Sequence, residues 1–207
     1  GMKLAKEGYV PLASLLFMIA GAWLIARPLA VILLFPLAMV VWFYRDPERV
    51  PPLDSGCWVS PADGKVVEIE EADDPYAGKS VKIGIFMNGF DVHVNRFPAS
   101  GTAEGFLYVP GKKWFAIAPK ASLENERLYT HVMTEQGKTT LVQIAGILAR
   151  RISCHIRKGD TLARGDRYGM IKLGSKVDVY LPLSVRPSVH LGQRVKAGES
   201  VIGVVEK

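Results

Sequence analysis

Apolar residues fill the first quarter of the chain almost without interruption. In the stretch 9–44 the one charged residue is Arg27, and the proline after it divides the stretch into two apolar halves, 10–26 and 28–44, of 17 residues each. As an α-helix each half would reach roughly 25 Å, the short limit for crossing the hydrocarbon core of a bilayer. The pattern therefore predicts a pair of apolar helices. The charged segment RDPER at 45–49 ends this pair and is unlike the small-residue cleavage site of a signal peptide.

Residues 1–49 are accordingly expected to form a membrane anchor, either with two crossings or as a hairpin inserted from one side. The alternative is a helical hairpin buried inside a globular fold. In both membrane arrangements the basic residues before and after the apolar run, Lys3, Lys6, Arg45 and Arg49, lie on the same side. The positive-inside rule assigns that side to the cytoplasm. We therefore expect the protein at the cell membrane, with residues 50–207 on the cytoplasmic side.

Residues 50–207 show a different pattern, in which Gly and Pro separate short β-branched runs. The strand-like runs are 66–69, 81–86, 141–144 and 177–181, and helical periodicity is limited to about 120–127. Such spacing is typical of an all-β sandwich or barrel. The fold class predicted is mainly β, with an N-terminal apolar helical hairpin.

Two segments of this β-rich region, 159–165 and 192–198, share the form G-x-x-Φ-x-x-G, and each precedes an apolar strand. Two glycines six residues apart around one apolar residue predict a turn, a short strand and a second turn. The spacing resembles the barrel-sandwich hybrid of lipoyl and biotinyl carrier domains. We therefore expect a barrel-sandwich-hybrid-like domain. A carrier function is disfavoured, because Lys172 in MIKL is displaced by one residue from the modified lysine of such domains.

Composition narrows the classes of function. The chain has 207 residues, with 26 Lys and Arg against 20 Asp and Glu and a formal net charge of +6. The basic residues are spread along the chain, which disfavours a nucleic-acid partner and agrees with an anionic membrane. The two cysteines, Cys57 and Cys154, lie far apart, which disfavours a thiolate metal site or a disulfide framework.

Four short motifs carry the candidate chemistry. They are SPADGKV at 60–66, DVHVNR at 91–96, ENER at 124–127, and the Gly174-Ser175 dipeptide within YGMIKLGSKVDVYLP at 168–182. In this order, behind an apolar N-terminus that ends in RDPER, they closely resemble the phosphatidylserine decarboxylases in their short bacterial and archaeal form. The resemblance covers nearly the whole chain.

The resemblance implies a self-processing enzyme. Ser175 would attack the carbonyl of Gly174, and cleavage between them would give a β chain, residues 1–174, and an α chain, residues 175–207, that stay together as a heterodimer. Ser175 would become a pyruvoyl group, which condenses with the substrate amine and accepts the electrons released with CO₂. The implied reaction converts phosphatidylserine, or a related serine phospholipid, to phosphatidylethanolamine. Neither a metal nor pyridoxal phosphate is expected.

Two further catalytic residues are implied. His93 lies in the alternation Val92-His93-Val94, where a strand would point it away from its neighbours, and a neutral imidazole is a natural general acid and base. The alternative is a structural core histidine. Asp63, in a Pro-Ala-Asp-Gly turn, is the implied partner that orients or assists the base during self-cleavage.

One position departs from the family pattern. Long-form members carry a second histidine three residues after the position of His93, and here that residue is Arg96. Either His93 serves both self-cleavage and decarboxylation, or His131 or His155 takes the second role.

Cations are needed for the lipid phosphate and the serine carboxylate. The candidates are Lys112 and Lys113, which precede Trp114-Phe115, together with Arg96 and Arg127.

The sequence leaves the oligomeric state open, with a homodimer as the assembly to test. The remaining alternative is a non-enzymatic membrane-bound β scaffold in which Gly174-Ser175 is only a turn.

Overall fold

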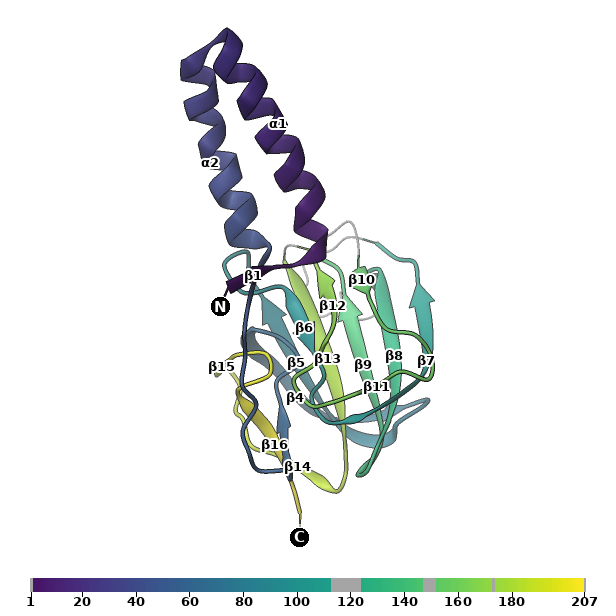
Figure 1. Cartoon of the computed structure of the whole chain (residues 1–207). Helices are drawn as coiled ribbons and strands as arrows, with labels where there is room; N and C mark the ends of the chain where they lie inside the picture. Colours follow the sequence, from purple (N-terminus) through teal and green to yellow (C-terminus); the bar gives the residue numbers. More distant parts are fainter. Residues whose placement is uncertain (1, 113–123, 147–151, 173, 207) are drawn as a thin grey trace. The chain divides into compact units, whose positions relative to one another are not determined.

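The computed structural model describes residues 2–112, 124–146, 152–172 and 174–206. The chain separates into two compact units, Gly1–Glu48 and Arg49–Lys207, and each is described by itself. Figure 1 shows the helical pair of the first unit and the sheets of the second. Half of the segment 120–127, where the sequence allows a helix, lies outside the described residues, and strand β8 begins at Arg127.

The first unit is a helical hairpin. Its elements are β1 (Met2–Leu4), η1 (Lys6–Gly8), α1 (Tyr9–Ile25), α2 (Arg27–Phe43) and β2 (Arg45–Pro47). The predicted pair of apolar helices is confirmed, with each helix starting one residue earlier than the apolar half. Ala26 separates the helices because its backbone is extended, with φ −149° and ψ 91°.

The two ends of this hairpin are joined to each other. Strands β1 and β2 pair antiparallel, with Leu4 opposite Arg45. Large apolar side chains such as Phe17 and Leu24 are 82% and 86% exposed, whereas the small Ala22 and Ala30 are buried. Because apolar residues cover the helices on all sides, water is an unfavourable surrounding for this hairpin and lipid a favourable one.

The second unit is built from antiparallel strands. They are β3 (Cys57–Val59), β4 (Gly64–Asp74), β5 (Gly78–Met87), β6 (Val94–Arg96), β7 (Gly101–Val109), β8 (Arg127–Thr134), β9 (Gly137–Ile144), β10 (Ile152–Cys154), β11 (Thr161–Leu162), β12 (Arg167–Ile171), β13 (Ser175–Pro182), β14 (Val185–Pro187), β15 (Arg194–Val195) and β16 (Val201–Val205). The mainly β prediction is confirmed.

Three sheets make up this unit. The largest has eight strands in the order β11-β7-β8-β9-β13-β5-β4-β15, and two three-stranded sheets have the orders β10-β12-β6 and β14-β16-β3. The eight-stranded sheet ends in the short strands β11 and β15, so it stays open, and the barrel form of the prediction is not realised. Figure 1 shows β13 inside this sheet, between β5 and β9.

The two glycine repeats form the predicted turns. All four of their glycines, Gly159, Gly165, Gly192 and Gly198, have positive φ, and the strands between them are β11 and β15. The central apolar residues Leu162 and Val195 are buried. The repeats thus supply the two edge strands of the large sheet, and they end it with strands of only two residues.

Candidate active site

The Gly174-Ser175 dipeptide combines an open backbone with a buried side chain. Gly174 has φ +66°, and a Cβ added to it would meet nothing within 4 Å. Ser175 begins β13, opposite Met87 on β5, and is fully buried. Its Oγ has no hydrogen-bond partner among the described residues. A buried hydroxyl without a partner is unfavourable for folding, and such groups are often retained for a chemical role.

A buried polar pair lies beside the strand partner of Ser175. The Asn95 Nδ2 donates to the Met87 Sδ at 3.8 Å, and the Gln143 Nε2 donates to the Asn95 Oδ1 at 2.9 Å. Asn95 and Gln143 are fully buried on β6 and β9. The pair links the β10-β12-β6 sheet to the large sheet at the end where Ser175 lies.

His93 is fully buried immediately before β6, and not within a strand as the alternation suggested. Val92 and Val94 are buried as well, so burial does not alternate here. The His93 ring is fixed by its Nδ1, which lies 2.8 Å from the Asp91 carbonyl oxygen. Because a carbonyl only accepts, Nδ1 carries a proton, and in the neutral form of the ring the lone pair is on Nε2.

The backbone of His93 contacts the strand that leads to the cleavage site. The Ile171 N–H donates to the His93 carbonyl at 3.3 Å. Ile171 ends β12, and Ser175 follows four residues later. His93 therefore lies beside the last residue of β12, and the contact of Asn95 with Met87, the strand partner of Ser175, locates this segment at the Ser175 end of the large sheet.

Asp63 lies next to this segment. Its carboxylate accepts hydrogen bonds from the backbone N–H groups of Ala197, at 2.8 Å, and Val92, and it pairs with Arg49 at 3.0 Å. Burial raises the pKa of Asp63 above its ordinary value, although the Ala197 N–H and the Arg49 guanidinium favour the carboxylate. Asp63 thus holds the backbone of the residue before His93.

Arg96 has a buried position with backbone partners. Its Nη1 donates to the Gly165 carbonyl at 2.9 Å. Its Cδ lies so close to Gly198 that a Cβ added to this glycine would be only 2.9 Å from it. Arg96 therefore packs against the last glycine of both G-x-x-Φ-x-x-G repeats.

The other histidines differ from His93 in burial or in position. His131 stacks on Tyr76 with ring centroids 4.3 Å apart, and burial lowers its pKa. Arg127 of β8 and Lys176 of β13 both pair with Ile144 of β9, so Arg127 marks the Ser175 end of β8. His131 is four residues further along β8, which separates it from that end by roughly 13 Å. His155 and His190 are exposed.

Two of the predicted cations come together at the Ser175 end. Arg127 donates from Nη1 to the Asn125 carbonyl at 3.0 Å, and Lys112 forms a bridge with Asn125 and an ion pair with Glu124 at 3.4 Å. The Asn125 side chain donates to the Ala145 carbonyl at 2.8 Å. Ala145 follows β9, whose last residue pairs with Lys176, so these cations lie about two strands from Ser175. Lys113 lies outside the described residues.

Sequence reasoning missed three contributors. Arg49, assigned to the anchor, falls in the second unit and pairs with Asp63 and with Glu199 at 3.0 Å. The Asn95–Gln143 pair was also missed. The available signal was an asparagine and a glutamine in otherwise apolar strand runs.

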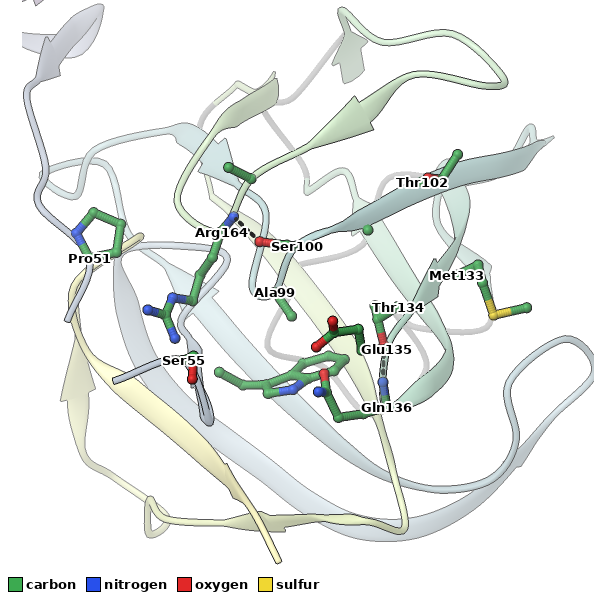
Figure 2. Close-up of a pocket in the computed structure, with 13 residues that line it drawn as sticks. Pro51, Ser55, Ala99, Ser100, Thr102, Met133, Thr134, Glu135, Gln136 and Arg164 are labelled. Atoms are coloured by element: carbon green, nitrogen blue, oxygen red, sulfur yellow. Dashed lines mark hydrogen bonds between the residues drawn. The ribbon is translucent and has the colours of Figure 1, made fainter. Parts of the chain in front are cut away.

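A pocket of about 630 Å³ lies elsewhere in the second unit. Figure 2 shows Pro51, Ser55 and Arg164 around it together with Glu135 and Gln136 of the β8–β9 turn. This turn lies near the Pro182 end of β13, since the Ser184 hydroxyl donates to the Gln136 carbonyl at 3.2 Å. The pocket is therefore at the far end of the sheet from Ser175. Among the described residues, no three His, Cys, Asp or Glu side chains gather as a metal site.

Known proteins resemble the chain along almost its whole length. The family model described as phosphatidylserine decarboxylase matches residues 37–203. A phosphatidylserine decarboxylase proenzyme of Nitratidesulfovibrio vulgaris is 48% identical over 197 residues, which cover 94% of this chain and 89% of that protein. Proenzymes of the same name from Nitrosomonas europaea and Burkholderia cenocepacia are each 43% identical, covering 96% and 99% of this chain and 94% and 97% of theirs.

Proposed function

The chain belongs to the phosphatidylserine decarboxylase family, and we propose that it cleaves itself between Gly174 and Ser175 and then decarboxylates a serine phospholipid. The substrate is phosphatidylserine or a close relative, and the product is the corresponding ethanolamine lipid. The observation that carries this proposal is the combination of Gly174 at φ +66° with a buried Ser175 whose Oγ has no described partner.

Self-cleavage uses atoms of the chain alone, with one water. The Ser175 Oγ attacks the Gly174 carbonyl carbon and gives up its proton, the C–N bond breaks, and an ester replaces the amide. Loss of the Ser175 Cα proton then expels the Gly174 carboxylate and leaves dehydroalanine, which water hydrolyses to a pyruvoyl group and ammonia. Gly174 suits this chemistry because no side chain shields its carbonyl and its φ is one that other residues rarely adopt.

Residues 1–174 and 175–207 fit a pair of chains that stay associated, since β13 lies between β5 and β9. A pyruvoyl group at position 175 would be held at the buried start of β13, where it supplies an electron sink for the pair released with CO₂. The orphaned Ser175 hydroxyl and the unshielded Gly174 carbonyl fit its formation. We expect neither a metal nor pyridoxal phosphate.

His93 is the proton carrier in this proposal. Its Nδ1 is fixed on the Asp91 carbonyl, which leaves Nε2 as the nitrogen that takes or gives a proton. Asp63 supports it by holding the Val92 backbone. Since His131 stacks on Tyr76 and His155 is exposed, we assign both self-cleavage and decarboxylation to His93, with Arg96 in a packing role.

The anionic headgroup is assigned to the cations at the Ser175 end of the sheet. Lys112 and Arg127 are gathered around Asn125 there, and Lys113 is the third candidate by sequence. Arg96 is less suited to this role, because it is buried and donates to a backbone carbonyl. A homodimer remains the assembly to test.

The helical hairpin is the proposed membrane anchor. Among the described residues, the helical stretch Lys6–Ile25 is long and apolar enough to span a bilayer, and Arg27–Phe43 is a shorter apolar helix. Cation–π pairs lie at both ends of the hairpin, with Arg27 5.5 Å from the Trp23 ring and Arg45 4.1 Å from the Trp42 ring. Such pairs suit the two bilayer interfaces, so we propose two crossings with the second unit in the cytoplasm.

The topology is tested by labelling single cysteines from outside the cell. With Cys57 and Cys154 replaced by serine, a cysteine is placed at Ala26 between the helices or at Leu183 in the second unit. A membrane-impermeant maleimide should label position 26 in cells with a permeabilised outer membrane, and position 183 only after lysis. Protection of position 26 in both conditions would indicate a hairpin inserted from one side.

Self-cleavage is tested by the intact mass of the purified protein. Wild type should give two pieces, with a blocked N-terminus on the 33-residue fragment 175–207. Ser175→Ala should give one uncleaved chain, while the matched control Ser184→Ala, two residues past the other end of β13, should cleave as wild type does. An uncleaved wild-type chain would overturn the proposed function, and a membrane-bound β scaffold would then be the better description.

A further inference from the structure

The second residue of the proposed C-terminal chain is a buried lysine. Along β13, Val177, Val179 and Leu181 belong to the hydrophobic core, whereas Lys176 and Asp178 alternate with them and point to the other face of the sheet. Lys176 is only 4% exposed and Asp178 only 2%. Lysines are rarely buried unless they are paired, so the contacts of Lys176 require an explanation.

Lys176 belongs to an ion-pair network that crosses three neighbouring strands. Its Nζ pairs with the Glu68 Oε2 on β4 and with the Asp178 Oδ1 at 3.1 Å. The other oxygen of Glu68 pairs with Lys82 of β5 at 2.9 Å, and Lys82 also pairs with Glu70. Burial opposes ionisation of Glu68, but the two ammonium groups lower its pKa on balance.

A glycine lets Lys176 reach across β5 to β4. Gly84 lies on β5 opposite both Asp178 and Glu68. A Cβ on Gly84 would lie 2.6 Å from the Lys176 Cε and 3.0 Å from the Asp178 Oδ1. The lysine stem therefore passes directly over Gly84, and any larger residue there would block its path.

We infer that Lys176 is a positioning residue that fixes the reactive N-terminus of the C-terminal chain after self-cleavage. This inference rests on the proposed function. Before scission the peptide bond to Gly174 holds Ser175 in place. After scission a new chain end begins at 175, and chain ends fray unless they are tied down. The Lys176–Glu68 pair ties this end to β4, which belongs to the other chain, one residue from the reacting group.

The first test separates positioning from stability. Lys176→Met removes the ammonium, Lys176→Arg keeps a cation, and Lys79→Met is the control on an exposed lysine of β5. For each protein the extent of scission is read by intact mass, the pyruvoyl content by titration with a carbonyl reagent, and kcat and KM on a dispersed short-chain phosphatidylserine.

We expect Lys176→Met to cleave but to lose about tenfold in kcat per pyruvoyl group with little change in KM, because misplacement of a reacting group lowers the rate of the chemical step. Lys176→Arg should recover most of that loss, and Lys79→Met should match wild type. A kcat per pyruvoyl group equal to wild type in Lys176→Met, whatever its thermal midpoint, would overturn the inference and leave Lys176 a structural residue.

Two further variants cover a failure of Lys176→Met to fold. Glu68→Gln keeps the shape of the partner and removes its charge, and Gly84→Ala obstructs the path of the lysine. Both should lower kcat per pyruvoyl group in the same direction, and wild-type values in both would again overturn the inference. If wild type itself is neither cleaved nor active, the proposed function fails; if only the variants behave as wild type, the inference fails alone.

Discussion

The two ends of strand β13 differ in how their polar groups are satisfied. At the Ser175 end the serine hydroxyl is buried without a described partner, and the adjacent Lys176 and Asp178 are buried charges. At the Pro182 end lies the open pocket of Figure 2. Its cation, Arg164, donates to the carbonyls of Pro52, Asp54 and Cys57.

Two structural signs of a functional site, a pocket and a buried hydroxyl without a described partner, thus occur at opposite ends of β13. The Pro182 end has the volume of a ligand pocket, but its arginine already has three backbone acceptors. The Ser175 end has buried polar atoms whose retention is unfavourable for folding. In the proposed function the reaction site is therefore the end with the unsatisfied serine hydroxyl and not the end with the pocket, although the pocket also holds one buried atom without a described partner, the Trp58 Nε1.

The largest effect should come from the proton carrier at the Ser175 end. Because His93 is assigned to both steps, His93→Gln should slow self-cleavage and decarboxylation, each by roughly 10²–10⁴-fold, the usual contribution of a general acid and base. Glu135→Gln, which changes an exposed carboxylate in the pocket, should leave kcat unchanged. The measurements are the extent of scission by intact mass and the decarboxylation rate per total protein. An equal loss in both variants would remove the distinction between the two ends.

Two glycines offer a matched pair for self-cleavage. Gly174 and Gly159 both have positive φ, +66° and +95°, and both have open space where a Cβ would lie. Gly174→Ala should slow scission by about tenfold or more, because alanine disfavours this φ by roughly 1–2 kcal/mol and shifts the carbonyl that Ser175 attacks. Gly159→Ala should lose similar stability and cleave normally. Normal cleavage in Gly174→Ala would show that its φ is irrelevant to the chemistry.

The arginine of the pocket should matter for stability and not for catalysis. Arg164→Met removes the donor to three carbonyls and should lower the free energy of unfolding by about 2 kcal/mol, with kcat per pyruvoyl group unchanged. Denaturant unfolding beside the exposed control Arg186→Met measures the difference. If activity fell while stability did not, the pocket would have a catalytic role.

The smallest effect is a change in the pH dependence of stability. Burial raises the pKa of Asp178 to about 6 from 3.8, although Lys176 favours the carboxylate. Between about pH 4 and 6 the folded protein therefore binds a proton that the unfolded chain has released, so this group makes stability fall as pH rises. Asp178→Asn should remove that slope from the unfolding profile, whereas Asp73→Asn, at an exposed position, should keep it.

The elements of the fold were largely predictable because they rest on local patterns. The apolar halves became α1 and α2, and the glycine spacing gave the turns around β11 and β15. Closure of the sheet was not predictable, because it depends on pairing between strands far apart in sequence. The sheet stays open because the short strands β11 and β15 form its two edges, and the local sequence does not indicate which strands they pair with.

Site residues that stand in a sequence motif were predictable, whereas those that reach the site only through tertiary contacts were not. Gly174-Ser175 and His93 stand in motifs, but the strand expected around His93 begins only at Val94, and the residues on both sides of His93 are buried as it is. The sequence predicts Arg49 as the end of a membrane anchor, whereas its pairing with Asp63 depends on a turn that only the fold brings near. Likewise, Lys176 reaches Glu68 because Gly84 lies between them in the sheet, which a sequence pattern does not reveal.

The place of β13 in the fold bears on how the mature protein is made. Residues 175–207 supply an interior strand of the large sheet and, through β14 and β16, two strands of another sheet. If the backbone is cut at Gly174 only after these strands have paired, folding is the assembly of one chain, whereas recovery from denaturation requires two separate molecules to meet. Refolding of the cleaved protein should therefore depend on protein concentration. The lifetime of the folded, cleaved protein would then be set by its rate of unfolding.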